Sequence, residues 1–140
     1  MSNPNVNDIV VDDGSKTYSI KNKQGEYLGE FRFRPTDTNI VSRYKEVVDF
    51  FNNFKTPSGT AEEAVREAER EVVEKIDYLI GGDSKNSFFS ILGPFSLLAS
   101  GELYFENVLT AIAKVIEKEF SVSAGRLQRR KNKYVEKYRK

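Results

Sequence analysis

The sequence predicts an α+β domain in which an N-terminal β-hairpin packs on a bundle of about four helices. Apolar residues alternate with polar ones between residues 8 and 34, and from residue 40 onward they recur at helical spacing. The chain has 140 residues, of which 39% are hydrophobic, and this is enough apolar material for the core of one domain. We expect a disordered N-terminus over residues 1–7, a single domain over residues 8–125 and a basic helical tail over residues 126–140.

Two or three antiparallel strands are predicted before residue 35. Residues 17–21 and 26–34 flank Asn-Lys-Gln-Gly, which places Gly25 where a tight turn needs a positive φ angle, so they should form the hairpin. Residues 9–11 are the candidate third strand, because a second turn signal, Asp-Asp-Gly, follows them. So small a sheet is marginal alone and has unpaired edges. We therefore expect it to pack on helices, and we expect the chain to form a homo-oligomer.

Two helices are predicted between residues 36 and 82. Pro35 ends the second strand, and residues 36–38 offer side-chain oxygens that can cap a helix from Ile40 to about residue 53. After a linker at residues 56–59, Thr60 and Glu63 have the spacing of a capping box. The apolar face that follows predicts a second helix, which should end at the two glycines 81 and 82.

Two further helices are predicted in the second half of the chain. Asp83 or Ser84 can cap a short apolar helix through Leu92, and residues 95–102 should form a compact loop or a single helical turn. The strongest amphipathic pattern lies between residues 103 and 120, and it places Val108, Ile112 and Ile116 on the buried stripe. Residues 121–125 weaken the pattern, so we expect the basic tail to be a hinged or frayed helical extension.

The composition excludes most catalytic templates. The chain has no cysteine and no histidine, so it has no thiolate nucleophile, no imidazole base and no usual ligand for zinc. Carboxylates at residues 63, 67 and 71 recur on one helix face, but we interpret them as a solvated acidic face partly paired with Arg66, Arg70 and Lys75. We expect no enzyme, no cofactor and no metal site.

Positive charge is concentrated at the C-terminus. The formal net charge is +1, but residues 126–140 hold eight basic residues against one acidic residue, a net charge of +7 that leaves −6 for the rest. Such a distribution favours an acidic partner for the tail or attraction between tail and body within an oligomer. The polar first eight residues are unlike a secretory signal, and the apolar stretch 88–99 is too short to span a membrane. We expect a cytoplasmic protein.

Four pieces of the chain, in order, resemble a known family. They are the hairpin end at residues 29–40 (GEFRFRPTDTNI) leading into a helix with Arg43, an acidic linking helix, the segment 91–96 (ILGPFS), and residues 101–116 followed by the basic end 133–138 (KYVEKY). Together, over roughly residues 17–140, they resemble the tail assembly chaperones of long-tailed phages and prophages of Gram-positive bacteria. The resemblance implies a non-catalytic protein of the bacterial host cytoplasm that binds the tape measure protein and keeps it soluble during tail assembly.

The candidate partner-binding surfaces are the apolar segment before the last helix and the basic tail. A protein that holds a long helical partner needs apolar grooves and charge for capture. The candidate residues are Phe88, Phe89, Phe95, Leu98, Arg126, Arg129, Arg130, Lys133, Tyr134, Lys137 and Tyr138. The alternative is a nucleic-acid-binding accessory protein of a mobile element, because Tyr134 and Tyr138 could stack on bases while the cations follow the phosphates. We consider nucleic acid the less favoured partner.

Overall fold

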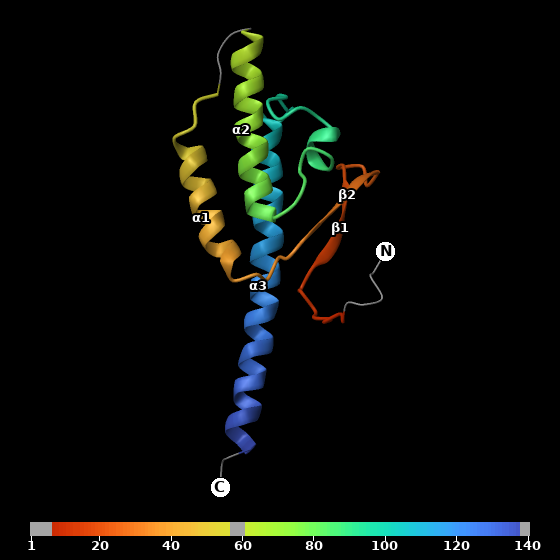
Figure 1. Ribbon diagram of the computed structural model, residues 1–140, viewed down its shortest axis with the longest axis vertical. Coiled ribbons are helices and arrows are strands. Elements are labelled where there is room, and N and C mark those ends of the chain that lie inside the picture. Colours follow the sequence, from red (N-terminus) through yellow and green to blue (C-terminus); the bar gives the residue numbers. More distant parts are fainter. Residues whose placement is uncertain (1–6, 57–60, 138–140) are drawn as a thin grey trace.

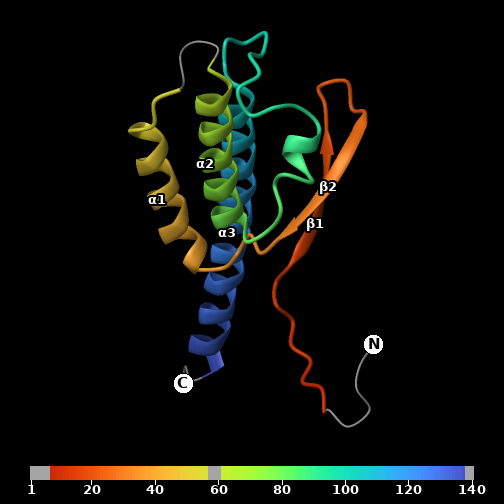
Figure 2. The same cartoon turned by 45° about the horizontal axis from the view of Figure 1, so that its top comes forward.

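In the part of the chain that the structure describes, a two-stranded hairpin and three α-helices form an α+β arrangement (Figure 1). The computed structural model describes residues 7–56 and 61–137, with the backbone alone for residue 124 and residues 126–137. Figures 1 and 2 show the long last helix as the axis of the molecule, with α1 and α2 along one side and the hairpin on another. The N-terminal residues 1–6 of the expected disordered segment lie outside the described residues.

The hairpin consists of β1 (Lys16–Lys21) and β2 (Tyr27–Phe33), which pair antiparallel from Lys16 opposite Phe33. The predicted strands are confirmed to within one residue. The candidate third strand is wrong, because residues 9–11 form no strand and pair with no other described segment of the chain. A β-bulge interrupts the ladder near the turn, where Ile20 pairs with Gly29 and Lys21 pairs with Tyr27. Leu28 is therefore the extra residue of the bulged strand.

Helix α1 (Asn39–Asn52) follows the hairpin through a short junction anchored by buried Pro35. Thr38 is the N-cap residue but makes no side-chain capping hydrogen bond. Of the three residues expected to offer cap oxygens, Asp37 makes the polar contact instead, because its carboxylate accepts the backbone N–H of Asn39 at 2.9 Å and pairs with Arg43 at 2.9 Å. The hydrogen bond from Asn39, and then the pairing with Arg43, hold the pKa of Asp37 below its ordinary value. This junction fixes the direction in which α1 leaves the sheet.

Helix α2 (Glu62–Ile80) packs beside α1, and its buried face contains Ala68, Val72, Ile76 and Leu79. Gly81 ends it in the left-handed conformation with φ +62°, as the sequence predicts. Ala61 occupies the N-cap position without a side-chain cap, and Thr60 of the predicted capping box lies outside the described residues. Between the two helices, the Tyr78 hydroxyl donates to Glu46 at 2.8 Å.

The predicted short helix up to Leu92 is wrong, because this segment contains a single 3₁₀ turn, η1 (Phe88–Ser90). Its serines bond back to the main chain, with Ser87 Oγ donating to the Asp83 carbonyl at 2.8 Å and Ser90 Oγ to the Ser87 carbonyl at 2.9 Å. Such bonds compete with helical ones, and the Gly93-Pro94 pair prevents extension. Residues 95–102 are a compact loop, as expected, with an isolated bridge between Leu97 and Leu103.

Helix α3 (Tyr104–Lys137) is one continuous helix, so the hinge expected at residues 121–125 does not interrupt its backbone. The predicted stripe is confirmed, since Val108, Ile112 and Ile116 belong to the buried core cluster. Phe33 and Phe88 join that core from the sheet and from η1, and the rings of Phe31 and Phe88 lie 4.6 Å apart between centroids. No helix among residues 7–56 and 61–137 combines the length and apolarity required to cross a bilayer.

Candidate functional site

An apolar groove lies where the turn end of the hairpin meets η1, the loop before α3 and the first turns of α3. We call it the hairpin groove, and its volume is about 410 Å³. This falls within the size range of pockets that hold small ligands or anchoring side chains. Its apolar lining consists of Ile20, Leu28, Phe88, Ile91, Leu92, Leu98, Ala99, Val108 and Ala111. Leu28 and Leu92 are both more than a third exposed, so apolar surface is open to solvent in the groove.

The polar edge of the hairpin groove includes Lys21 and Lys23, which flank the hairpin turn. The Asn22 side chain shapes this turn, because its Oδ1 accepts the N–H groups of Gln24 and Glu26, both at 3.0 Å. Gly25 completes the turn with φ +84°, a conformation that favours glycine. The two exposed lysines are therefore held beside an apolar surface, a combination suited to an apolar segment with acidic flanks.

The opposite wall of the groove is fixed by main-chain hydrogen bonds. The Tyr104 N–H donates to the Ser96 carbonyl at 2.8 Å, and the Phe105 N–H donates to the Pro94 carbonyl at 2.9 Å. The Tyr104 hydroxyl donates to the Phe88 carbonyl at 2.8 Å, and burial raises the pKa of this phenol. The loop and η1 are thus tied to the start of α3, so this wall is preformed.

The hairpin is tied to α3 by Glu119. This carboxylate lies 2.7 Å from the Lys16 ammonium and accepts a hydrogen bond from the Tyr18 hydroxyl at 3.3 Å. The contact with Lys16 lowers the pKa of Glu119, while burial and then the negative charge of Glu119 raise the pKa of Tyr18 to about 12. The two pKa shifts favour the charged Glu119 carboxylate and the neutral Tyr18 phenol. The ion pair and the hydrogen bond are therefore both formed at neutral pH.

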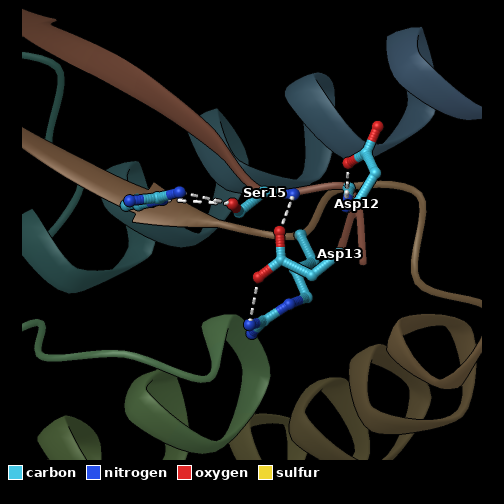
Figure 3. Close-up of polar contacts among 6 residues, drawn as sticks. Asp12, Asp13 and Ser15 are labelled. Atoms are coloured by element: carbon cyan, nitrogen blue, oxygen red, sulfur yellow. Dashed lines mark hydrogen bonds and ion pairs between the residues drawn. The ribbon is translucent and has the colours of Figure 1, made fainter. Parts of the chain in front are cut away.

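The chain before β1 forms an exposed N-terminal arm (residues 7–11) on a fixed base (residues 12–15). Figure 3 shows the base, where Asp12 accepts the Gly14 N–H at 2.9 Å and Asp13 accepts the Ser15 N–H at 3.0 Å. The base is joined to β2, because Ser15 Oγ accepts from Arg32 at 2.8 Å.

Just after β2, Arg34 forms a second connection to the base through an ion pair with Asp13 at 2.6 Å. The hydrogen bonds from Ser15, and then the contact with Arg34, hold the pKa of Asp13 far below its ordinary value. The base is therefore fixed in its charged form at neutral pH, whereas the arm beyond it is exposed.

The structure divides the four predicted site residues of the segment before α3 between two places. Phe88 and Leu98 line the hairpin groove, and Phe88 is only 5% exposed, so it forms the floor. Phe89 instead packs edge-on against Tyr104, with 5.9 Å between ring centroids. Phe95 packs between Phe54 and Phe105, at 6.1 and 5.7 Å. These two rings support the loop rather than line the groove.

The predicted site residues of the tail lie on the last part of α3. Arg126, Arg129, Arg130, Lys133, Tyr134 and Lys137 belong to the helix, whose side chains are not described beyond Gly125, and Tyr138 lies outside the described residues. On α2, the expected pairing of the acidic face is found in part, since Arg70 pairs with Glu67 while Arg66 pairs with the neighbouring Glu62 at 2.5 Å. The expected pairing of Lys75 is not seen, because its ammonium lies over the Phe50 ring, 4.8 Å from the centroid. Within residues 7–56 and 61–137, no cluster of three or more potential metal ligands occurs.

Sequence reasoning missed most of the groove. Lys21, Lys23 and Leu28 come from the hairpin turn and its bulge, and an Asn-Lys-Gln-Gly turn signal predicts the turn but not what packs under it. Leu92 could have been suspected from its place in the apolar run before Gly93. No family model, curated protein or solved structure matches the chain.

Proposed function

We propose that this chain is a non-catalytic phage or prophage tail assembly chaperone that binds the tape measure protein in the cytoplasm of the bacterial host. The proposal rests on the resemblance carried by residues 29–40, the segment 91–96 and the basic end of the chain. One structural observation supports it most strongly. Helix α3 extends well past the other elements and presents the basic tail on a helical backbone (Figure 1).

The length of α3 gives the scale of this projection. Its 34 residues correspond to about 51 Å, and Phe120 is the last α3 residue among the described side chains that packs against the core. About 25 Å of helix follows Phe120, and both cartoon views show it clear of the other elements (Figures 1 and 2). A projecting cationic helix can lie along an acidic face of a long helical partner.

Co-expression with a tape measure protein tests the proposal. The full chain should keep that protein in the soluble fraction and co-purify with it. A chain ending at Gly125 should lose this activity while its melting temperature changes little, because the described core contacts lie before that residue. A tape measure protein that stays equally soluble with the truncated chain would place capture elsewhere on the domain.

A charge-reversal pair separates electrostatic capture from loss of the helix itself. The triple variant Arg129→Glu, Arg130→Glu and Lys133→Glu should reduce co-purification. The matched control, Lys45→Glu, Lys55→Glu and Lys85→Glu, changes the net charge equally at three exposed sites on the body and should leave it unchanged. Equal losses in the two variants would mean that net charge, not the tail, determines binding.

Nucleic acid is the second candidate partner, and the tail's net charge of +7 is the observation that favours it. A cationic helix that neutralises phosphates releases counterions, so its affinity should fall steeply as salt rises. We expect negligible gel shift of random DNA or RNA near physiological salt. Submicromolar binding of random nucleic acid that is abolished by the tail triple variant would favour this alternative.

A further inference from the structure

The N-terminal arm exposes three consecutive aliphatic side chains. Ile9, Val10 and Val11 are 90%, 91% and 74% exposed, and they are the most exposed consecutive large apolar residues among the described side chains. Single exposed aliphatic residues are ordinary, whereas a contiguous run of them marks an interaction surface. Acidic residues flank the run, with Asp8 before it and Asp12 and Asp13 after it.

The arm cannot reach the hairpin groove of its own chain. Its base is bonded to Arg32 and Arg34 at the open end of the hairpin, and Figure 2 shows the chain leaving this point away from the hairpin turn. Three extended residues before Asp12 span at most about 10 Å. Ile20, the first groove residue along the chain, lies four strand residues beyond Lys16 in the opposite direction, about 13 Å further from the arm. The arm is therefore too short to fold back into this groove.

We propose that the arm of one copy lies in the hairpin groove of a second copy of this chain. The two surfaces match in chemistry, because the groove has an open apolar lining with Lys21 and Lys23 on its hairpin side and Glu102 on its loop side, and the aliphatic run of the arm lies between Asp8 and Asp12. Asp13 is already paired with Arg34, so Asp8 is the carboxylate that we expect to face the lysines. Residues 9–11 of the arm are all β-branched, and such side chains have few rotamers, so they lose little conformational freedom on docking. Two copies that exchange arms form a closed dimer. This inference does not depend on the identity of the tail's partner.

Cysteine cross-linking tests the placement directly, because the natural chain contains no cysteine. A Val10→Cys chain is mixed with an affinity-tagged Leu92→Cys chain under mild oxidation, and disulfide-linked heterodimers are counted on a non-reducing gel. The control replaces Val10→Cys with Val41→Cys, since Val41 is a 57% exposed aliphatic residue on α1. We expect heterodimers at least about ten times more abundant with Val10→Cys than with Val41→Cys. Equal yields would overturn the proposal.

Sedimentation of the cysteine-free chain tests the energetics. The double variant Ile9→Asp and Val10→Asp should raise the dissociation constant for self-association at least about tenfold, because it removes two buried aliphatic contacts. The control Val41→Asp should leave the constant unchanged. A wild-type chain that is monomeric at about 100 µM, or an arm variant that associates as tightly as the wild type, would overturn the proposal.

A charge exchange distinguishes docking in this groove from non-specific association through the arm. Lys21→Glu with Lys23→Glu should weaken association several-fold, and adding Asp8→Lys should restore part of it, because opposite charges again face one another. These exposed positions carry no core contacts, so folding is retained. If the lysine variants associate like the wild type and Asp8→Lys has no effect on them, the arm does not dock beside these lysines.

Discussion

Lys16 and Glu119 lie 103 positions apart in the sequence, yet the Lys16 ammonium is 2.7 Å from the Glu119 carboxylate. This pair joins the first residue of β1 to α3, and the Tyr18 hydroxyl donates to the same carboxylate. The hairpin is thus held to the helix both by its apolar face and by a polar contact at its open end.

Replacing Glu119 with Gln should lower the free energy of unfolding by about 1 kcal/mol at neutral pH, because the partly exposed ion pair and its hydrogen bond are weakened. The folded-state pKa of Glu119 is lowered, so its contribution is present above the ordinary glutamate pKa and is lost as pH falls through the folded value. Urea denaturation at neutral pH and near pH 3 measures this. A difference from wild type that stays constant at both values would contradict the assignment.

Tyr18 should remain neutral to unusually high pH. Its folded pKa of about 12 exceeds the ordinary 10.0, so its contribution to stability is present below pH 10 and is lost as pH rises toward 12. Phenolate absorbance, taken as wild type minus Tyr18→Phe, reports this one group. Glu119→Gln should move the titration only part of the way back, because burial is the larger cause. A difference titration centred at 10 would show that Tyr18 is solvated.

Truncation of the α3 stripe should cost more stability than truncation on its exposed side. Ile112 is 1% exposed, and Ile112→Ala should lower the free energy of unfolding by about 2 to 5 kcal/mol through lost burial and a cavity. Val122→Ala, at a residue 42% exposed on the same helix, is the control and should change it by less than about 1 kcal/mol. Thermal or urea unfolding of both variants measures the contrast, and equal losses would contradict the observed burial.

Ser84 should contribute to stability through Asp77. The fully buried Ser84 donates its N–H to Asp77 Oδ1 at 2.7 Å and its hydroxyl to the same oxygen at 2.5 Å. Ser84→Ala removes the second bond to a charged acceptor and should lower the free energy of unfolding by about 1 to 3 kcal/mol. Exposed Ser100→Ala serves as the comparison. Matching melting temperatures for the two variants would mean that the Asp77 contact is not stabilising.

Local patterns in the sequence predicted most of the regular structure. Pro35 restricts the backbone at the end of β2, whereas Gly25 and Gly81 allow the positive φ angles of the hairpin turn and of the end of α2. Each of these ends was therefore predictable from residues close by in the sequence. The helix expected before Leu92 failed because serine side chains bond to the backbone there, a competition that apolar spacing does not reveal.

The candidate site was less predictable, because it depends on a bulge and on packing between distant segments. Strict alternation would place Leu28 on the same face as Glu30 and Arg32, but the bulge lets it line the groove beside Ile20. Residues 9–11 have the composition of a strand and yet are unpaired in one copy of the chain. Whether a β-branched run pairs depends on an available edge, which composition does not specify.

The core position of Phe33 has a consequence for synthesis of the chain. Phe33 is buried together with Phe105, Val108 and Ile112, all of which are added to the chain long after the hairpin. Because translation adds about 5 to 20 residues per second, the apolar face of the hairpin in the nascent chain stays uncovered for several seconds. During this interval the nascent chain exposes aromatic side chains near the ribosome, and release of the completed α3 is the step that covers them.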